Sequence, residues 1–262
     1  MIKLERQNYI MDKLLTEGSI LIVNLCKDLN CSDQTIRRDL QEMEEAGKLK
    51  RTHGGAYLIS SEDDKGAPIS LRAQLIPDEK RHIGIIAAHN FIQPDDIIMI
   101  DSSTTCLSLA ETIINMHIPV TIITNSHNIV SLFNKNNMTA KLIVIGGIYK
   151  ERSRSFVGPT AISQIQGFYA DKAFISCSAL DQNLGMLDSY IQQKYVREAM
   201  LTHSKKRYLL ADNTKFDDDG NFLIHDFSIL DGIITNSKPS DDWLNIFASN
   251  NLQFLWKDND VY

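Results

Sequence analysis

The first sixty residues follow a pattern of three short helices and a hairpin. Residues 5–17 place an apolar residue every three or four positions, the spacing of a helix with one buried face, and Gly18 would end that helix. Residues 22–29 repeat the pattern over two turns. After a further helix, the basic segment 48–58 predicts two short strands around a turn at Gly54-Gly55.

The third helix, which begins after Ser32, has the residue types that read DNA. The Ser32 hydroxyl can cap the first turn. The apolar positions that follow at helical spacing are Ile36, Leu40 and Met43. The side chains left on the outward face are Gln34, Thr35, Arg37 and Arg38. Arg pairs with guanine, Gln with adenine, and Thr with a thymine methyl group or a phosphate. With the helix and turn before it, this segment predicts a helix-turn-helix with its recognition helix starting at Ser32.

The hairpin that follows the recognition helix is interpreted as a wing. Its side chains would lie along phosphates or in the minor groove. The wing residues expected to meet DNA are Lys50, Arg51, His53 and Gly54. Residues 1–58 are therefore predicted to form a winged helix-turn-helix domain whose partner is a double-stranded DNA operator.

Residues 79–262 predict an α/β domain. After an amphipathic helix at residues 80–91, short apolar runs rich in β-branched residues alternate with helical stretches. Apolar runs without alternation are typical of strands buried on both faces of a mostly parallel sheet. The expected strands are residues 97–100, 120–123, 142–145, 173–175, 208–211 and 232–234. Residues 59–78 are polar and contain Gly and Pro, so they are interpreted as a linker.

Polar residues and glycines follow five of these strands, at the sheet edge where α/β domains bind ligands. Hydroxyl and N–H groups at the start of a helix suit a phosphate, whereas Asp, Asn and Lys suit sugar hydroxyls and negative charge. The candidate effector residues are Asp101, Ser103, Thr104, Thr105, Thr124, Asn125, Gly146, Gly147, Arg152, Asp181 and Lys215. Each loop taken alone is explained equally well by helix capping. Together, the five loops predict a pocket for a small polyhydroxylated anion, such as a sugar phosphate.

Composition and charge narrow the classes of protein. Hydrophobic residues make up 43% of the chain and charged residues 23%, as in ordinary soluble globular proteins. No run of 18 apolar residues could span a membrane, and the polar start lacks a signal peptide, so we expect a cytoplasmic protein. The net charge of −6 lies beyond residue 60, because residues 1–60 carry nine basic and nine acidic residues. The electrostatics permit DNA binding through a local basic edge but do not require it.

Enzymatic and metal-binding functions have weaker support. A sugar-phosphate isomerase with a DNA-binding appendage is the alternative; its general base would come from Asp101, Asp181 or Asp212, and none has a spacing that marks a base. No nucleophile elbow or two-histidine helical motif is present. Cys26 and Cys31 could be half a zinc site, but no second Cys/His pair follows, so buried reduced thiols are favoured. We expect no catalytic residue, metal or cofactor.

Two groups of residues resemble the DeoR family of bacterial transcriptional regulators. The N-terminal group is Arg6, Ile10, Leu14, Ser32, Thr35–Leu40 and Arg51–Ala56. The C-terminal group is Asp101–Thr105, Thr124-Asn125, Gly146-Gly147, Phe156–Pro159, Asp181 with Gly185, and Ala211–Phe216. The chain departs from the family pattern at Leu21, where a polar cap is common, at Gln192 and Gln193, where acids are common, and at Arg197, where Lys is common.

The resemblance implies a sensor domain with a fold similar to ribose-5-phosphate isomerase and coenzyme A transferases. It implies a repressor of a carbohydrate-catabolic operon that responds to a phosphorylated sugar. The implied phosphate loop is Asp101 with Ser103–Thr105, and the rest of the site is Thr124, Asn125, Gly146, Gly147 and Lys215. Because one small DNA-binding module makes too few contacts for specificity, we expect a homodimer or homotetramer.

Overall fold

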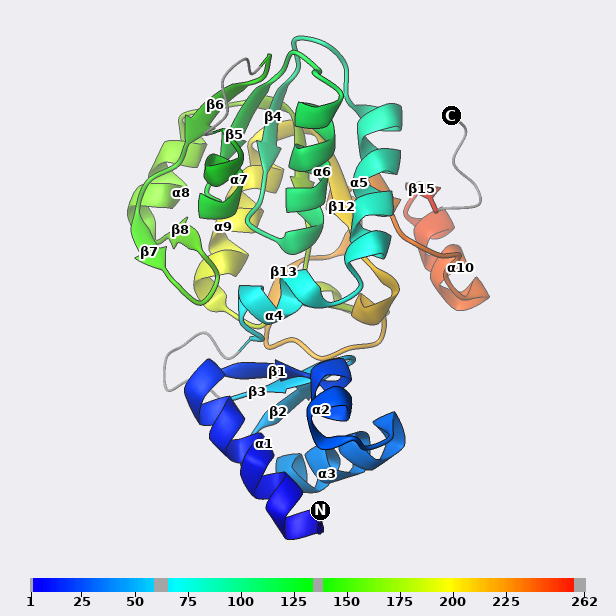
Figure 1. The fold of residues 1–262 in the computed structure, drawn as a ribbon. Coiled ribbons are helices and arrows are strands. Elements are labelled where there is room, and N and C mark those ends of the chain that lie inside the picture. Colours follow the sequence, from blue (N-terminus) through cyan, green and yellow to red (C-terminus); the bar gives the residue numbers. More distant parts are fainter. Residues whose placement is uncertain (1, 59–65, 134–138, 257–262) are drawn as a thin grey trace. The chain divides into compact units, whose positions relative to one another are not determined.

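The computed structural model describes residues 2–58, 66–133 and 139–256 (Figure 1). The chain forms two compact units that divide between Leu75 and Ile76. The first holds three helices and a small antiparallel sheet, and the second holds a parallel sheet covered by helices. The predicted fold class, a winged helix-turn-helix followed by a mostly parallel α/β domain, is confirmed. Within the described residues, no helix is long and apolar enough to cross a membrane.

The first unit follows the predicted order of helices and hairpin, with one added strand. Its elements are α1 (Lys3–Glu17), β1 (Ser19–Leu21), α2 (Ile22–Leu29), α3 (Asp33–Glu45), β2 (Lys50–Thr52) and β3 (Gly55–Tyr57). Strand β1 was not predicted; it pairs with β3 and completes a sheet of order β1-β3-β2. The hairpin turn is His53–Gly54, not Gly54-Gly55. Gly55 lies in β3, where a Cβ would come within 2.3 Å of the Ile20 carbonyl oxygen.

The recognition helix is held by its cap and by one buried ion pair. The Ser32 hydroxyl accepts the backbone N–H of Thr35 at 3.3 Å, as predicted for an N-cap. The apolar stripe of α3 is buried together with Ile10 and Leu14 of α1. Asp39 is also buried, and its carboxylate accepts Nε of Arg6 at 2.7 Å. This pair fixes the angle between α1 and α3.

The interpretation of residues 59–78 as a linker is wrong for its second half. Helix α4 (Ile69–Gln74) lies there, and both Ile69 and Leu71 are buried. Leu71 packs on the wing, with its Cδ1 3.0 Å from the point where a Cβ on Gly55 would stand. The sequence did not predict this helix, because its two buried residues are only two positions apart and do not show the spacing of a helix face. Residues 59–65 lie outside the described residues.

The second unit is built on a seven-stranded sheet in which all neighbouring strands are parallel. The strand order is β15-β14-β12-β9-β4-β5-β6. The strands are β4 (Ile97–Ile100), β5 (Thr121–Thr124), β6 (Lys141–Val144), β9 (Ala170–Ile175), β12 (Ser204–Leu210), β14 (Gly232–Ile234) and β15 (Gln253–Leu255). The first six contain or adjoin the predicted runs. Strand β15 was not predicted, because three residues with one polar position give no distinct run.

Helices cover both faces of this sheet, as the unbroken apolar runs predicted (Figure 1). Alternate strand residues enter two separate cores: Ile98 and Ile100 pack with α5, α6 and α7, whereas Met99 packs with α8, α9 and α10. The helices are α5 (Pro77–Phe91), α6 (Thr104–Asn115), α7 (His127–Leu132), α8 (Pro159–Gln166), α9 (Ile191–Thr202) and α10 (Asp241–Ser249). The sheet is therefore rigid, and its strand ends are fixed in position.

The chain reverses its direction of travel across the sheet between β4 and β9. From β4 it proceeds to β5 and β6 on one side, and from β9 to β12, β14 and β15 on the other. Ligands of α/β sheets bind outside the carboxyl ends of strands at such a point. Short elements surround these ends: β7 (Ile148–Lys150), β8 (Ser155–Val157), β10 (Ala179–Asp181), β11 (Gly185–Asp188), β13 (Phe222–His225), and the 3₁₀ helices η1 (Asn213–Lys215) and η2 (Phe227–Ile229).

Leu71→Ala should destabilise the first unit, because α4 is anchored there by a fully buried leucine. A loss of about 2–5 kcal/mol is expected for such a truncation. Hydrogen exchange followed by mass spectrometry reads the opening of this unit separately from that of the second unit. Gln74→Ala, an exposed position on the same helix, is the control and should change little. Equal protection in Leu71→Ala and the wild type would show that α4 does not stabilise the unit.

Candidate DNA-binding surface and anion site

The outward face of α3 presents most of the predicted DNA-reading side chains. Gln34, Arg37 and Arg38 are exposed, whereas Thr35 is half-buried with its hydroxyl 2.9 Å from that of Ser32. Arg38 is the most exposed of these side chains, at 83%, and its one ion pair within the described residues is with Glu42 at 3.7 Å. A groove of about 540 Å³, here called the α3 groove, is lined by Lys3, Arg6, Gln34, Thr35, Arg38, Asp39 and Glu42.

Arg37 connects the recognition helix to the wing. Its Nε pairs with Asp33 one turn earlier, and its NH1 donates to the backbone carbonyl of His53 at 3.0 Å. The His53 carbonyl belongs to the hairpin turn, so Arg37 fixes the wing relative to α3. Arg37 was predicted as a DNA contact, and the structure adds this positioning role.

The wing residues divide into exposed and internal positions. Lys50 and His53 are exposed, and Lys50 forms no ion pair among the described residues. Arg51 pairs with Glu44 of α3 at 2.7 Å, and its backbone N–H donates to the same carboxylate. Gly54 has a packing role, because its carbonyl accepts the N–H of Ile22 and a Cβ there would stand 2.8 Å from Leu75. Lys50 and His53 are therefore the wing side chains best placed to meet phosphates.

Parallel strands bring most of the predicted effector residues to one edge of the second unit. Ile100 of β4 pairs with Thr124 of β5 and with Phe174 of β9. The residues that follow, Asp101 and Asn125, therefore leave the sheet side by side. The backbone N–H of Asp101 donates to the Phe174 carbonyl at 3.1 Å, which ties this loop to β9 across the switch point.

A buried ion triad organises this edge. Arg197 of α9 donates through Nε to Asp101 at 2.7 Å and through NH1 to Asp188 of β11, and all three side chains are buried. Asp101 also accepts the N–H groups of Ser103 at 2.9 Å and Ser176 at 3.2 Å. Burial alone would raise the pKa of the Asp101 carboxyl, but Arg197 and Ser103 outweigh it and lower that pKa. Asp101 was predicted to contact the effector; instead, both its oxygens are engaged by the protein, and it shapes the loop.

Helix α6 begins directly after this loop and leaves polar groups without partners. The Ser103 hydroxyl caps the helix by accepting the N–H of Cys106 at 3.1 Å. Thr104 and Thr105 form the first turn. Neither their hydroxyls nor their backbone N–H groups have a hydrogen-bond partner in the described part of the chain. The start of α6 therefore offers several donors to an anion.

Asn125 has one satisfied and one unsatisfied end. Its Nδ2 donates to the Phe156 carbonyl at 2.9 Å, whereas its Oδ1 is buried and has no partner among the residues described. Buried polar atoms are seldom left unpaired, so Oδ1 is a candidate ligand acceptor. Thr124 differs, because its hydroxyl donates to the Ile100 carbonyl at 2.6 Å and accepts the N–H of Ser126. Thr124 is thus a structural residue of this loop.

Of the two glycines after β6, Gly147 has a structural explanation. The N–H of Gly146 donates to the Gln164 side chain at 2.9 Å. Gly147 has a φ of +146°, and a Cβ there would come within 2.6 Å of the Val157 carbonyl oxygen. Gly147, predicted as an effector residue, therefore allows a close approach of the backbone to β8 of the protein itself. Arg152, a further predicted residue, lies half-buried in the turn between β7 and β8.

Asp181 does not join the cluster. It lies at the β10–β11 turn, where its carboxylate accepts the N–H groups of Asn183 and Leu184, both at 2.8 Å. Three residues of strand, about 10 Å, separate it from Ser178, which hydrogen-bonds to Asp188 of the triad.

Lys215 lies in η1, which directly follows β12, and it forms no ion pair within the described residues. Its charge and that of Arg197 both act on the Cys177 thiol that follows β9. Burial raises the pKa of this thiol to about 12, and the two cations oppose that rise. The ammonium of Lys215 therefore lies within electrostatic reach of the same cluster as Arg197.

A chain of uncharged side chains was not predicted. Ser102 donates to Gln193 Oε1 at 3.4 Å, and Gln193 Nε2 donates to the Ser155 hydroxyl. The Ser155 hydroxyl lies 2.9 Å from that of Ser153. All four residues are buried, and they connect the α6 loop, α9 and β8. Gln193 was noticed only as a departure from the family pattern, and its partners show no spacing that could identify them.

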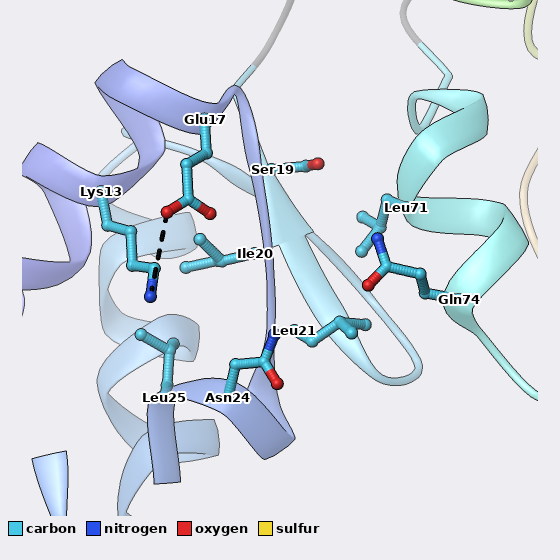
Figure 2. A pocket seen from close by; sticks show the side chains of 9 residues that line it. All are labelled: Lys13, Glu17, Ser19, Ile20, Leu21, Asn24, Leu25, Leu71 and Gln74. Atoms are coloured by element: carbon cyan, nitrogen blue, oxygen red, sulfur yellow. Dashed lines mark ion pairs between the residues drawn. The ribbon is translucent and has the colours of Figure 1, made fainter. Parts of the chain in front are cut away.

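A separate small pocket lies in the first unit, between α1, β1, α2 and α4 (Figure 2). Its lining includes Leu71 of α4 and the ion pair of Lys13 with Glu17 at 3.9 Å. Its volume of about 70 Å³ holds a few water molecules and is too small for a sugar phosphate. This pocket is therefore not a candidate for the predicted anion site.

Arg197→Ala should destabilise the second unit strongly. Breaking a buried pair by removing one partner costs about 3–5 kcal/mol, because the remaining carboxylates stay buried without compensation. Lys194→Ala is the matched control, since it removes a partly exposed pair with Glu198 on the same helix; about 0.5 kcal/mol is expected. Urea unfolding monitored by tryptophan fluorescence measures both, because Trp243 lies in the core of this unit. Equal losses would mean that the triad does not organise the unit.

Comparison with known proteins matches both parts of the chain to one family. A model described as the DeoR-like helix-turn-helix domain matches residues 6–62, and one described as the DeoR C terminal sensor domain matches residues 76–237. Ribose 5-phosphate isomerase A from Methanocaldococcus jannaschii matches with a TM-score of 0.38 and 12% identity, over 53% of this chain and 54% of that chain. A likeness at that level carries no argument about this chain.

Curated relatives match along nearly their whole length. The chain is 32% identical to the HTH-type transcriptional regulator IolR of Bacillus subtilis. This match of 242 residues spans 92% of this chain and 93% of that protein. It is 32% identical to the lactose phosphotransferase system repressor of Lactococcus lactis, over 94% and 96% of the two chains. It is 30% identical to the L-fucose operon activator of Haemophilus influenzae, over 90% and 93%. The chain therefore belongs to the DeoR family of DNA-binding transcriptional regulators.

Proposed function

We propose that this regulator represses a carbohydrate-catabolic operon and that a sugar monophosphate, bound at the strand ends of the second unit, relieves the repression. The observation that carries the proposal is the first turn of α6. There Thr104 and Thr105 offer hydroxyl and N–H donors that have no partner in the described part of the chain.

The phosphate would bind at the start of α6. Helix N-termini carry a partial positive charge and free N–H groups, and both favour a phosphate. Ser103 satisfies only one of these N–H groups, so the rest stay available to a ligand. Lys215, whose ammonium has no ion-pair partner among the described residues, supplies a full charge.

The charges around the site favour a single phosphate. Asp101, Asp188 and Arg197 together carry one net negative charge, so the triad offers no cation to a ligand. Lys215 is left as the cation of the cluster without a protein partner in the described chain. The net negative charge of the triad would repel a second phosphate, whereas it would not repel an uncharged polyol.

The sugar hydroxyls would meet neutral polar groups. Asn125 Oδ1 is a buried acceptor without a partner in the described chain, and a hydroxyl is the ligand group that donates to it. Gln193 and the serines bonded to it supply further uncharged polar atoms close to the triad. These groups suit a sugar better than a carboxylate or an amine.

The names of the relatives support a role in sugar metabolism. One relative is a lactose phosphotransferase system repressor and another an L-fucose operon activator. We take repression, the direction of the Lactococcus lactis relative, as the direction here. The sensor units would hold two or four copies together, and an effector that prefers one sensor arrangement would change the spacing of the winged domains.

The isomerase alternative receives no support from the site. A general base for enolisation should titrate near neutral pH. Asp101 is paired with Arg197 and its pKa is lowered. Asp181 and Asp212 accept backbone N–H groups of their own turns.

Thr104→Val and Lys215→Ala should abolish the response to the effector and leave DNA binding intact. A thermal-shift screen against sugar phosphates and their parent sugars measures this, since a ligand at about 100 times its Kd stabilises by about 2.7 kcal/mol. Thr160→Val, an exposed threonine in the first turn of α8, is the matched control and should respond like the wild type. If Thr104→Val kept the full shift, the phosphate would not bind at α6.

Arg38→Ala should weaken operator binding by about 1–3 kcal/mol, because this exposed guanidinium reaches a base edge or a phosphate. The probe is a duplex selected by the wild-type protein from a random pool, with binding followed by fluorescence anisotropy. Arg81→Ala, an exposed arginine of the second unit, serves as the control. Unchanged affinity in Arg38→Ala, with the sugar-phosphate response retained, would place the DNA surface elsewhere than on α3.

A further inference from the structure

Helix α1 exposes an apolar stripe beside its buried face. Ile10 and Leu14 enter the core, whereas Leu4 and Leu15 are 65% and 64% exposed. Met11 lies between them at the margin of the core, and Asn8 is exposed. Scattered exposed leucines are ordinary on a protein surface, but these four residues fall on one face of the helix, at intervals of four, three and four. We call Leu4, Asn8, Met11 and Leu15 the α1 stripe.

The spacing of the α1 stripe is that of a coiled-coil seam. Leu4 and Met11 take d positions, and Asn8 and Leu15 take a positions. An Asn at an a position pairs with the same Asn of an identical parallel helix, because each amide both donates and accepts. Against an unrelated apolar helix, the Asn8 amide would be desolvated without a partner. The stripe therefore suits a second copy of this chain.

Flanking charges favour the parallel orientation. An antiparallel pair would bring Glu5 near Asp12 of the other copy, two like charges. It would also place Asn8 opposite Met11, which leaves the amide unpaired. Both effects disfavour the antiparallel arrangement.

The direction of α1 matches the geometry of a symmetric operator. At its N-terminal end, Lys3 pairs with Glu42 of α3 and Gln7 donates to the same carboxylate at 3.2 Å. Lys3 and Arg6 line the α3 groove with Gln34 and Arg38. The N-terminus of α1 thus lies on the DNA-reading side. A two-fold axis along a parallel α1 pair would run toward the DNA, as the dyad of a palindromic operator requires.

We propose that α1 of a second copy pairs in parallel along the α1 stripe and joins two winged domains across the operator dyad. The stripe is about 18 Å long and one helix face wide. The area that it can bury is therefore far smaller than the roughly 800 Å² per partner of a stable interface. The pair therefore forms only where the sensor units or the DNA have already brought two winged domains together. This rests on the proposed function: an effector that separates the winged domains would break the α1 pair and release the operator.

The first test is a disulfide trap in the full-length protein on its selected operator duplex. Asn8→Cys should form a disulfide between copies when glutathione disulfide oxidises the two thiols and is itself reduced to glutathione. Lys27→Cys, an exposed position on α2, is the control and should stay unlinked. Mass spectrometry of the linked peptide separates this bond from any formed by the native Cys26 or Cys31. No link at position 8, or equal linking at position 27, would overturn the proposal.

The second test uses duplexes with one or two half-sites. Leu15→Glu should weaken binding to the two-site duplex by at least about tenfold and leave the one-site duplex unchanged. Val23→Glu, at an apolar α2 position that is 54% exposed and lies outside the stripe, should match the wild type on both. An equal loss of affinity for both duplexes would mean that the stripe contacts DNA directly or stabilises the fold of the first unit. The proposal would then fail.

The two proposals fail in different ways. If no sugar phosphate shifts the melting temperature of the wild type, the proposed effector is wrong, yet the disulfide trap still reports on the α1 pair. If the sugar phosphate shifts the melting temperature and Asn8→Cys does not link, the pairing alone is wrong.

Discussion

The buried guanidinium of Arg197 holds together the elements around the strand ends of the second unit. It lies between the carboxylates of Asp101 and Asp188 and ties α9 to the ends of β4 and β11. A charge in such a place is tolerated only because two opposite charges and several N–H groups surround it. By fixing Asp101, it fixes the loop whose next residues open α6. The N–H groups at the start of that helix are thereby held at the switch point of the sheet.

Much of the fold follows from the pattern of apolar residues, because long helices and buried parallel strands leave distinct signals. The helix-turn-helix, its Ser32 cap and six sheet strands were predicted within a few residues. The elements that were not predicted are short. Strand β1 has three residues, α4 has two anchors spaced two apart, and the antiparallel strands around the site have three or four residues each. Such segments are stabilised by what they pack against, which local sequence does not show.

The site was predicted at the level of loops but not of individual atoms. The loops after β4, β5 and β12 were identified because residue types reveal which strand ends are polar. The partner of a carboxylate depends on the tertiary structure. The sequence therefore could not show that Asp101 forms an ion pair with Arg197, or that Asp181 accepts N–H groups of its own turn. Asn125 is the reverse case: only the structure shows that its amide has one atom paired and one unpaired.

On the DNA side, the winged unit carries little excess charge, and many of its cations are already paired with acids of the same unit. Arg37 holds the wing, while Arg38 and Lys50 remain exposed. One such domain supplies few phosphate contacts, so in the proposed oligomer the affinity for DNA would depend on how two domains are held. Control over their proposed pairing would then control operator binding.

The central claim is that a sugar monophosphate in the second unit controls the affinity of the first unit for DNA. The most direct measurement follows fluorescence anisotropy of the selected operator duplex while the bound protein is titrated with sugar monophosphates, their bisphosphates and their parent sugars. Release of the duplex by one monophosphate, and by neither its parent sugar nor its bisphosphate, is the expected result. Equal release by the parent sugar, or no effect of any monophosphate, would contradict the claim.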